Sequence, residues 1–195
     1  MNTTKVIIFN APPDCGKDFL SDYLVADMGA KKNEFKATLR KLVMYIYGIE
    51  EELYWAIYNN RILKEMPLKL FGGKSMRDLH IEVSEDVIKP FYGKSYFGDR
   101  AADLLTLGEV NVFADGGFVE ELLPVVHKVG HANVLIVRLR GVGSFAGDSR
   151  GYLPSASCVG VKFVDINYTK DAAGLGKVLS VVNEFLETKE LTETR

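Results

Sequence analysis

The sequence predicts an α/β fold of three layers, in which helices cover both faces of a mostly parallel, five-stranded sheet. Short apolar runs rich in β-branched residues are typical of strands that are buried on both faces of a parallel sheet. Amphipathic helical patterns alternate with these runs, as they do in parallel sheets. The expected strands are, in chain order, Lys5–Phe9, Asn33–Phe35, Val110–Ala114, Val134–Leu139 and Cys158–Ile166.

Seven stretches have the apolar spacing of helices that bury one face. In the second of them, Leu39, Leu42, Val43 and Ile46 recur at i, i+3, i+4 and i+7. The long, mostly helical region of about residues 36–108 is expected to be an insertion that covers a substrate. No repeat or composition break divides the chain, so one domain over residues 1–195 is expected. The expected helices are Gly16–Asp27, Lys36–Tyr47, Glu51–Tyr58, Met76–Lys89, Asp99–Leu107, Val119–Lys128 and Ala172–Leu186.

Composition and charge exclude several classes of protein. The 24 Lys and Arg residues and the 26 Asp and Glu residues give a net charge of −2. A protein whose main partner is nucleic acid or an anionic membrane is expected to be basic instead. No apolar run is long enough for a membrane span, and the N-terminus does not resemble a signal peptide. Cys15 and Cys158 form no disulfide framework, so a cytoplasmic location without membrane partners is expected. The sequence leaves open whether the chain forms a homodimer.

The segment from Lys5 to Asp27 has the order of a phosphate-binding loop: a buried strand, a tight turn, Gly-Lys and an amphipathic helix. In the pattern G-x-x-x-x-G-K-[ST], backbone amides and the helix N-terminus cradle phosphates, and the lysine reaches the β and γ phosphates. Two positions depart from the pattern, because Ala11 replaces the first glycine and Asp18 replaces the hydroxyl residue. The alternative is an unrelated strand–turn–helix that contains Gly-Lys. The residues expected to contact the nucleotide here are Ala11, Asp14, Cys15, Gly16, Lys17, Asp18 and Phe19.

Asp18 has two interpretations. A carboxylate suits Mg²⁺, either directly or through water, so Asp18 is the candidate metal ligand. An acidic residue in the first turn of a helix is also favourable by itself.

The loop Gly16-Lys17-Asp18-Phe19 resembles the variant phosphate loop of bacteriophage deoxynucleoside monophosphate kinases and of the related phosphomevalonate kinases. The likeness implies a P-loop NTPase-like kinase domain that uses ATP and Mg²⁺, in the host cytoplasm if a phage encodes it. It also implies that the loop at Asn167 holds the adenine. Further segments that resemble these kinases are Phe35–Lys41, Tyr45–Ile49, Ser75–Leu79, Val112–Asp115 and Asp165–Asn167.

One departure from these kinases affects the acceptor side. They commonly carry Asp-x-Arg after the third strand, whereas this chain has Asp115-Gly116-Gly117. Asp115 is a catalytic candidate, because it follows a buried strand at the edge where open α/β sheets bind ligands, and it would hold Mg²⁺ through water or orient the acceptor. Its alternative role is that of a turn residue beside the two glycines.

The remaining catalytic candidates are cations. Lys17 would neutralise the β and γ oxygens during phosphoryl transfer. The Gly- and Ser-rich segment of about residues 141–157 is expected to be a mobile lid. Arg140, at the end of the preceding strand, and Arg150, within the segment, would stabilise the transferring group. The alternative is a solvated loop in which Arg150 pairs with Asp148.

Three basic residues are candidates for binding the acceptor. Lys36 and Arg40 are one helical turn apart, so both could face one anion, and Arg77 lies on a later helix. Such charges are also typical of a solvent-exposed helix face. Five aromatic residues could stack on a base, although their helical spacing favours a core role: Tyr45, Tyr47, Tyr54, Trp55 and Tyr58.

The leading hypothesis is an ATP-dependent kinase that converts a deoxynucleoside monophosphate to the diphosphate. A second hypothesis changes the acceptor to the hydroxymethyl group of 5-hydroxymethyluracil in DNA, and a third to a small metabolite, as in phosphomevalonate kinases. The low net charge counts against a DNA acceptor. A hypothesis of another class is a nucleotide-binding module without catalysis, which would bind ATP without turnover.

Overall fold

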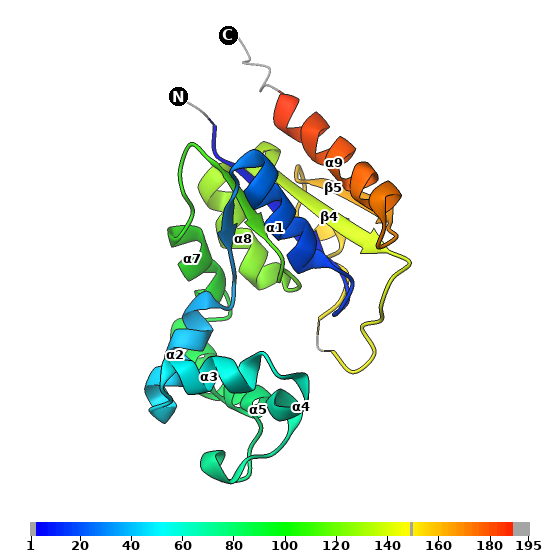
Figure 1. The fold of residues 1–195 in the computed structure, drawn as a ribbon. Coiled ribbons are helices and arrows are strands. Elements are labelled where there is room, and N and C mark those ends of the chain that lie inside the picture. The colour runs from blue at the N-terminus through cyan, green and yellow to red at the C-terminus, as the bar shows by residue number, and fades with distance from the viewer. Residues whose placement is uncertain (1–2, 149, 189–195) are drawn as a thin grey trace.

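A computed structural model describes residues 3–148 and 150–188 and contains a five-stranded sheet (Figure 1). The strand order is β2-β3-β1-β4-β5, and all four pairings in the described chain are parallel. Strand β1 is therefore central, with β3 and β4 as its neighbours. The strands are β1 (Lys5–Asn10), β2 (Lys31–Asn33), β3 (Val110–Phe113), β4 (Val134–Arg140) and β5 (Lys162–Asn167).

The sheet confirms the predicted α/β class but shifts two strands. Strand β2 ends at Asn33 instead of running over Asn33–Phe35, because the backbone N–H of Phe35 donates to the Asp115 side chain. The strand expected over Cys158–Ile166 begins only at Lys162. Gly160 precedes it in a turn with φ 89°, a left-handed conformation that ends any extended run.

Alternate side chains of β1 build two separate cores. Ile7 and Phe9 face helices α1 (Lys17–Met28) and α9 (Ala172–Glu187). On the opposite face, Val6 and Ile8 pack against α7 (Tyr96–Asp103) and α8 (Val119–Val129). The period of two along a strand therefore produces the expected three layers, with a helix pair on each side of the sheet.

Between β2 and β3 the chain forms a helical lobe, which we define as residues 37–92 (Figure 1). Its own core is built around Tyr54, Met76 and Leu79. The helix expected over Met76–Lys89 is interrupted, because the hydrogen bonding widens to a π-helical pattern after Ile81. The lobe contains α2 (Ala37–Tyr47), α3 (Glu51–Tyr58), α4 (Arg61–Glu65), α5 (Met76–Ile81), the π-helix η2 (Glu82–Ile88) and α6 (Lys89–Tyr92).

Two further expectations concern the cysteines and membrane-spanning segments. Cys15 and Cys158 are both free thiols in buried positions. None of the helices in the described ranges combines the length and apolarity that a bilayer crossing requires.

Candidate functional site

The loops that carry the candidate residues follow the carboxyl ends of the three central strands. Residues 11–16 follow β1, residues 114–118 follow β3, and residues 141–157 follow β4. Because β1, β3 and β4 are parallel neighbours, these loops meet at one edge of the sheet. This edge is where open α/β sheets place their ligands.

The loop after β1 folds tightly around its own lysine. Gly16 precedes α1 with φ 92°, a left-handed conformation that favours glycine. The ammonium group of Lys17 donates hydrogen bonds to the carbonyl of Ala11 at 2.9 Å and to that of Pro12. Lys17 is only 8% exposed, and burial lowers its pKa. A cation is thus held at the loop where the sequence predicts phosphate binding.

The neighbours of Lys17 in the loop have differing environments. Cys15 is buried, and its thiol donates to the Pro12 carbonyl at 3.0 Å, so it fills and braces the turn. The Asp14 carboxylate pairs with Arg61 of the helical lobe in an exposed position. Phe19 is 57% exposed on the outer side of α1. The Lys17 ammonium is therefore turned into its own loop, while Asp14 links the loop to α4.

Asp18 fits a magnesium role. It is exposed in the first turn of α1, beside Lys17, and its carboxylate has no hydrogen-bond or ion-pair partner in the described chain. The described residues contain no group of three or more His, Cys, Asp or Glu side chains that could hold a metal ion. Mg²⁺ commonly uses one or two carboxylates together with phosphate oxygens and water, so a single Asp is a suitable donor set.

The side chain of Asp115 connects two loops. One carboxylate oxygen accepts the backbone N–H of Phe35 at 3.1 Å, and the other accepts that of Lys36 at 3.0 Å. These bonds fix the start of α2 against the end of β3. Asp115 thereby positions Lys36, whatever else it contacts when ligands are bound.

Asn10, at the end of β1, was not singled out by the sequence analysis. Its side chain is fully buried, and its amide nitrogen donates to the carbonyls of Gly116 at 3.2 Å and Gly151 at 3.0 Å. Its amide oxygen accepts the N–H of Leu153 at 2.8 Å. Asn10 therefore ties the loop after β3 and the segment around Arg150 to the central strand. A polar residue directly after the apolar run Val6–Phe9 was the available signal.

Gly117 stands where the resemblance led us to expect an arginine, and Arg150 fills the space above it. A Cβ atom at Gly117 would lie 2.8 Å from Cδ of Arg150. The guanidinium of Arg150 makes a two-point ion pair with Asp148, at 3.0 Å from Nε and 2.6 Å from Nη2. This hydrogen bonding lowers the pKa of Asp148 to about 2 and raises that of Arg150. The pair of the alternative interpretation is present, but its side chains are largely buried instead of solvated, and Arg150 lies over Gly117.

Arg140 lies elsewhere. Its guanidinium stacks on the ring of Tyr152 at 3.6 Å and pairs with Asp165 of β5 at 2.5 Å. Asn167, the predicted adenine contact, is exposed at the end of β5, where its side-chain oxygen lies close to Gly141. Arg140 and Asn167 are thus on the β5 side of the sheet edge, apart from Arg150.

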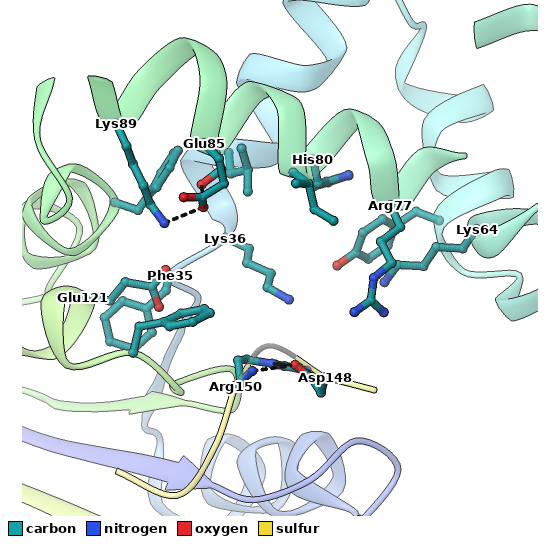
Figure 2. A pocket seen from close by; sticks show the side chains of 16 residues that line it. Phe35, Lys36, Lys64, Arg77, His80, Glu85, Lys89, Glu121, Asp148 and Arg150 are labelled. Carbon is teal, nitrogen blue, oxygen red and sulfur yellow. Dashed lines mark hydrogen bonds and ion pairs between the residues drawn. The ribbon is translucent and has the colours of Figure 1, made fainter. Parts of the chain in front are cut away.

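An inner pocket lies between the helical lobe and this edge of the sheet (Figure 2). Its volume is about 180 Å³. Figure 2 shows Lys36 near its centre, with Lys64 and Arg77 on one side and the Arg150–Asp148 pair below. Side chains from α2's start, α4, α5, η2, α8 and the lid segment therefore share one cavity. The lining residues used below are Lys36, Tyr58, Lys64, Arg77, Glu85, Lys89, Phe118, Glu121, Asp148 and Arg150.

Two lysines make the middle of the inner pocket strongly cationic. Burial, and then the nearby charge of Lys36, lower the pKa of Lys64 to about 8. Burial, and then Arg150, lower the pKa of Lys36. The Lys36 ammonium forms no hydrogen bond or ion pair with another described residue, and Lys64 lies 3.9 Å from the ring centroid of Tyr58. Since both charged forms are disfavoured in this state, an anion entering the pocket would relieve the mutual repulsion.

The other two predicted acceptor residues differ from each other. Arg77 lines the pocket and reaches Glu65 at 3.4 Å and the Gly147 carbonyl of the lid segment at 3.5 Å. Arg40 does not line it, because its guanidinium pairs with Glu34 and lies against the rings of Trp55 and Tyr58. The structure thus brings Lys36 and Arg77 to one cavity and leaves Arg40 outside it.

The aromatic cluster of the lobe is mainly core. Tyr54 is fully buried, stacks on Tyr58 with ring centroids 5.3 Å apart, and bonds to His80 at 2.7 Å. Tyr45, by contrast, is 88% exposed. Only Tyr58 of the five predicted rings reaches the inner pocket in the described chain.

The opposite side of the inner pocket is acidic. Burial, and then the Asp115 carboxylate, raise the pKa of Glu121 to about 7. The Glu121 carboxylate accepts no hydrogen bond from any described residue. Glu85 pairs with Lys89 at 2.5 Å nearby. Neither Glu121 nor Lys64 was found by the sequence analysis, because no spacing rule links them to Lys17.

Sequence comparison finds no matching family and no matching curated protein. Solved structures are similar in fold. A shikimate kinase from Bacteroides thetaiotaomicron aligns over 94% of this chain and 99% of its own, at 9% identity and a TM-score of 0.50. A kinase candidate from Chloroflexus aurantiacus aligns over 95% and 97%, at 14% identity and a TM-score of 0.46. A gluconokinase from Sinorhizobium meliloti aligns over 94% and 98%, at 12% identity and a TM-score of 0.37.

The fold of the chain is therefore that of the shikimate kinase, a five-stranded parallel sheet between helices. At this level of identity the likeness concerns the fold, and it assigns no substrate.

Proposed function

We propose that the chain is an ATP- and Mg²⁺-dependent phosphotransferase whose acceptor is a deoxynucleoside monophosphate. The observation that carries this proposal is the position of Arg150. Arg150 lines the inner pocket together with Lys36 and Lys64, while Gly151, the next residue, accepts a hydrogen bond from Asn10 at the end of β1, where the phosphate loop begins. A phosphoryl donor at the loop and an anionic acceptor in the pocket would then share one cation.

Each part of the proposal has its own support. The phosphotransferase part is supported by the loop with its folded-back lysine, and by the shared fold of the shikimate kinase from Bacteroides thetaiotaomicron. The acceptor part is supported by three cations, Lys36, Lys64 and Arg77, in one cavity beside this loop. The resemblance of Gly16–Phe19 to phage deoxynucleoside monophosphate kinases supports the choice of a nucleotide.

The residues have simple roles in this reaction. The bond between the γ phosphorus and the bridging oxygen of ADP breaks, while an oxygen of the acceptor phosphate bonds to that phosphorus. No proton has to move if the acceptor phosphate is fully ionised. Lys17 would exchange the carbonyls of Ala11 and Pro12 for phosphate oxygens, and Arg150 would face the transferring group. Mg²⁺ at Asp18 would neutralise further charge on the phosphates.

A second acceptor has one observation in its favour. The phage kinases named above commonly carry an arginine where this chain has Gly117, and here Arg150 covers that position. Without the arginine at this position, the usual contact to the acceptor phosphate is missing. This is compatible with a different acceptor, the hydroxymethyl group of 5-hydroxymethyluracil in DNA. The proposal of a free nucleotide takes precedence, because the inner pocket is small and cationic.

The test is an assay of ADP release with each deoxynucleoside monophosphate, with DNA that contains 5-hydroxymethyluracil, and with ATP alone. We expect turnover with at least one monophosphate, and a fall in kcat of about 10²–10³-fold for Lys17→Ala, as for removal of a group that stabilises transition-state charge. The matched control is Lys31→Ala, which removes an exposed lysine of β2. Turnover with DNA alone would transfer the proposal to the second acceptor. ATP binding without turnover on any acceptor would contradict both.

A further inference from the structure

The inner pocket has two chemically different sides, and the acidic side is not explained by phosphate binding. Lys64 and Arg77 lie on one side in Figure 2, and Glu121 and Glu85 lie on the other. A phosphate dianion near Glu121 would be repelled. The acidic side therefore suits a different part of the acceptor, one that offers hydrogen-bond donors.

The size of the inner pocket also indicates that only part of the acceptor binds inside it. Its volume of about 180 Å³ lies below the range of roughly 300–1,000 Å³ that is usual for sites of small organic ligands. An adjoining outer groove of about 560 Å³ shares Ile81, Glu85, Lys89, Phe118 and Glu121 with it. A ligand with its phosphate among the lysines would therefore extend past Phe118 and Glu121 into this groove.

The groups at this junction suit a nucleobase. Phe118 lines both cavities and is partly exposed, and the Lys89 ammonium lies 5.6 Å from its ring centroid. An aromatic ring at this junction offers a surface on which a flat base can stack. The carboxylate of Glu121 is partly exposed, lines both cavities and has no hydrogen-bond partner among the described residues, so it is available to a ligand. A carboxylate accepts hydrogen bonds only, so at the exocyclic position of a base it favours the amino group of cytosine or adenine over the carbonyl oxygen of uracil or hypoxanthine.

We infer that this junction is a nucleobase subsite, in which Glu121 accepts a hydrogen bond from the exocyclic amino group of the acceptor base while the base lies against Phe118. The inference rests on the proposed function, since it concerns the acceptor of that reaction. It makes Glu121 a specificity-determining residue. It also assigns the substrate class more narrowly, to monophosphates of amino-bearing bases.

The experiment compares two pairs of acceptors that have nearly the same shape. In each pair an amino group is replaced by a carbonyl oxygen: dCMP against dUMP, and dAMP against deoxyinosine monophosphate. We expect the amino member of at least one pair to have a kcat/KM about 10- to 100-fold higher, as for a hydrogen bond to a charged group. In Glu121→Gln this ratio should fall at least tenfold, because a neutral amide can either accept from the amino group or donate to the carbonyl.

Two further variants separate base reading from a structural role. Glu52→Gln, an exposed substitution on α3 with the same chemistry, should leave the ratio unchanged. Phe118→Leu should raise KM for both members of a pair by about tenfold without changing their ratio, as expected for lost stacking. If Glu121→Gln does not fold, as judged by thermal melting, Glu121→Asp keeps the charge on a shorter side chain and should lower the ratio.

The outcomes distinguish this inference from the proposed function. Turnover of monophosphates with no preference for the amino member in either pair would overturn the inference and leave the kinase proposal intact. An unchanged ratio in an active Glu121→Gln enzyme would do the same. If no monophosphate is phosphorylated, the proposed function fails, and the inference fails with it.

Discussion

The phosphate loop and the inner pocket are built in contrasting ways. The loop is one continuous stretch between β1 and α1, and its lysine bonds to carbonyls five and six residues earlier in the chain. The pocket draws on Lys64 of the helical lobe, Glu121 of α8 and Arg150 of the segment after β4. A continuous site is specified by local backbone geometry, whereas the pocket exists only once distant segments have packed together.

Arg150 joins these two regions, so its removal should have the largest effect on catalysis. We expect Arg150→Ala to lower kcat by about 10²-fold, as for loss of one group that stabilises transition-state charge. Arg140→Ala should change kcat less than about fivefold, because Arg140 faces Tyr152 and Asp165 instead of the pocket. Steady-state kinetics with ATP and the preferred acceptor measures both. Equal losses in the two variants would show that the lid arginines act together.

Asn10 tests whether the two regions are held together by a single buried side chain. Asn10→Ala leaves the N–H of Leu153 and the carbonyls of Gly116 and Gly151 without their partner. Unsatisfied buried groups cost about 1–3 kcal/mol each, and partial relaxation should limit the fall in the free energy of unfolding to about 2–4 kcal/mol. Gly151, which Asn10 holds, is the residue next to Arg150. Loss of this contact should displace Arg150, so kcat should also fall by about tenfold or more.

Denaturant unfolding and kinetics check this prediction together. The control is Asn59→Ala, which alters an exposed asparagine at the end of α3. A stability loss without any change in kcat would mean that Arg150 is positioned by Gly117 and Asp148 alone.

The pH dependence should be confined to the pocket and should be the smallest effect. Lys64, with a pKa of about 8, must be protonated to attract a phosphate, so kcat/KM for the acceptor should fall above that pH, by up to about tenfold per pH unit. Glu121, with a pKa of about 7, must be ionised to accept its hydrogen bond, so kcat/KM should also fall below pH 7. Charges that face these groups include Lys36, Arg77 and Arg150.

Two variants show which residue causes the fall in kcat/KM on each side of this pH profile. Lys64→Arg should remove the alkaline limb, because arginine stays charged throughout this range. Glu121→Gln should remove the acidic limb. An unchanged profile in both variants would place the controlling groups on the substrates or on the phosphate loop.

Folding stability gives the same groups an independent readout. The folded pKa of Lys64 lies below its ordinary value of 10.5, so the unfolded chain binds more protons between about pH 8 and 10.5, and stability should rise with pH in that window. The folded pKa of Glu121 lies above its ordinary value of 4.5, so stability from this group should fall as pH rises from about 4.5 to 7.

The phosphate loop could be predicted from the sequence better than the inner pocket, because the loop is continuous and the pocket is assembled from distant segments. The strand–loop–helix of residues 5–28 could be predicted, because apolar runs, Gly16 and Lys17 are local signals. Lys36 and Arg77, which were singled out through segments that resemble known kinases, both line the inner pocket, and their role in binding an acceptor stays a prediction. Arg40 was expected beside Lys36 from helical spacing, but Glu34 and Trp55 hold it elsewhere. Tertiary partners decide where a long side chain points, and spacing along one helix does not contain them.

The residues that sequence reasoning missed carry no distinctive local signal. Lys64 lies on a five-residue helix that has too few positions for a periodic pattern. Asn10 bonds to Gly151, which is 141 residues away. Glu121 lies in the first turn of a helix, where an acid is common for reasons unrelated to binding.

Consecutive prolines at positions 12 and 13 give the phosphate loop fewer amide donors but a more rigid backbone. Neither ring nitrogen carries a hydrogen, so this stretch offers the phosphates two fewer amide donors than other sequences would. The same rings restrict the backbone before any ligand arrives, and Gly143 of the lid segment lies against Pro12 and Pro13. Nucleotide capture at this loop should therefore involve little disorder-to-order transition, so that the entropy lost on binding comes from the ligand more than from the protein.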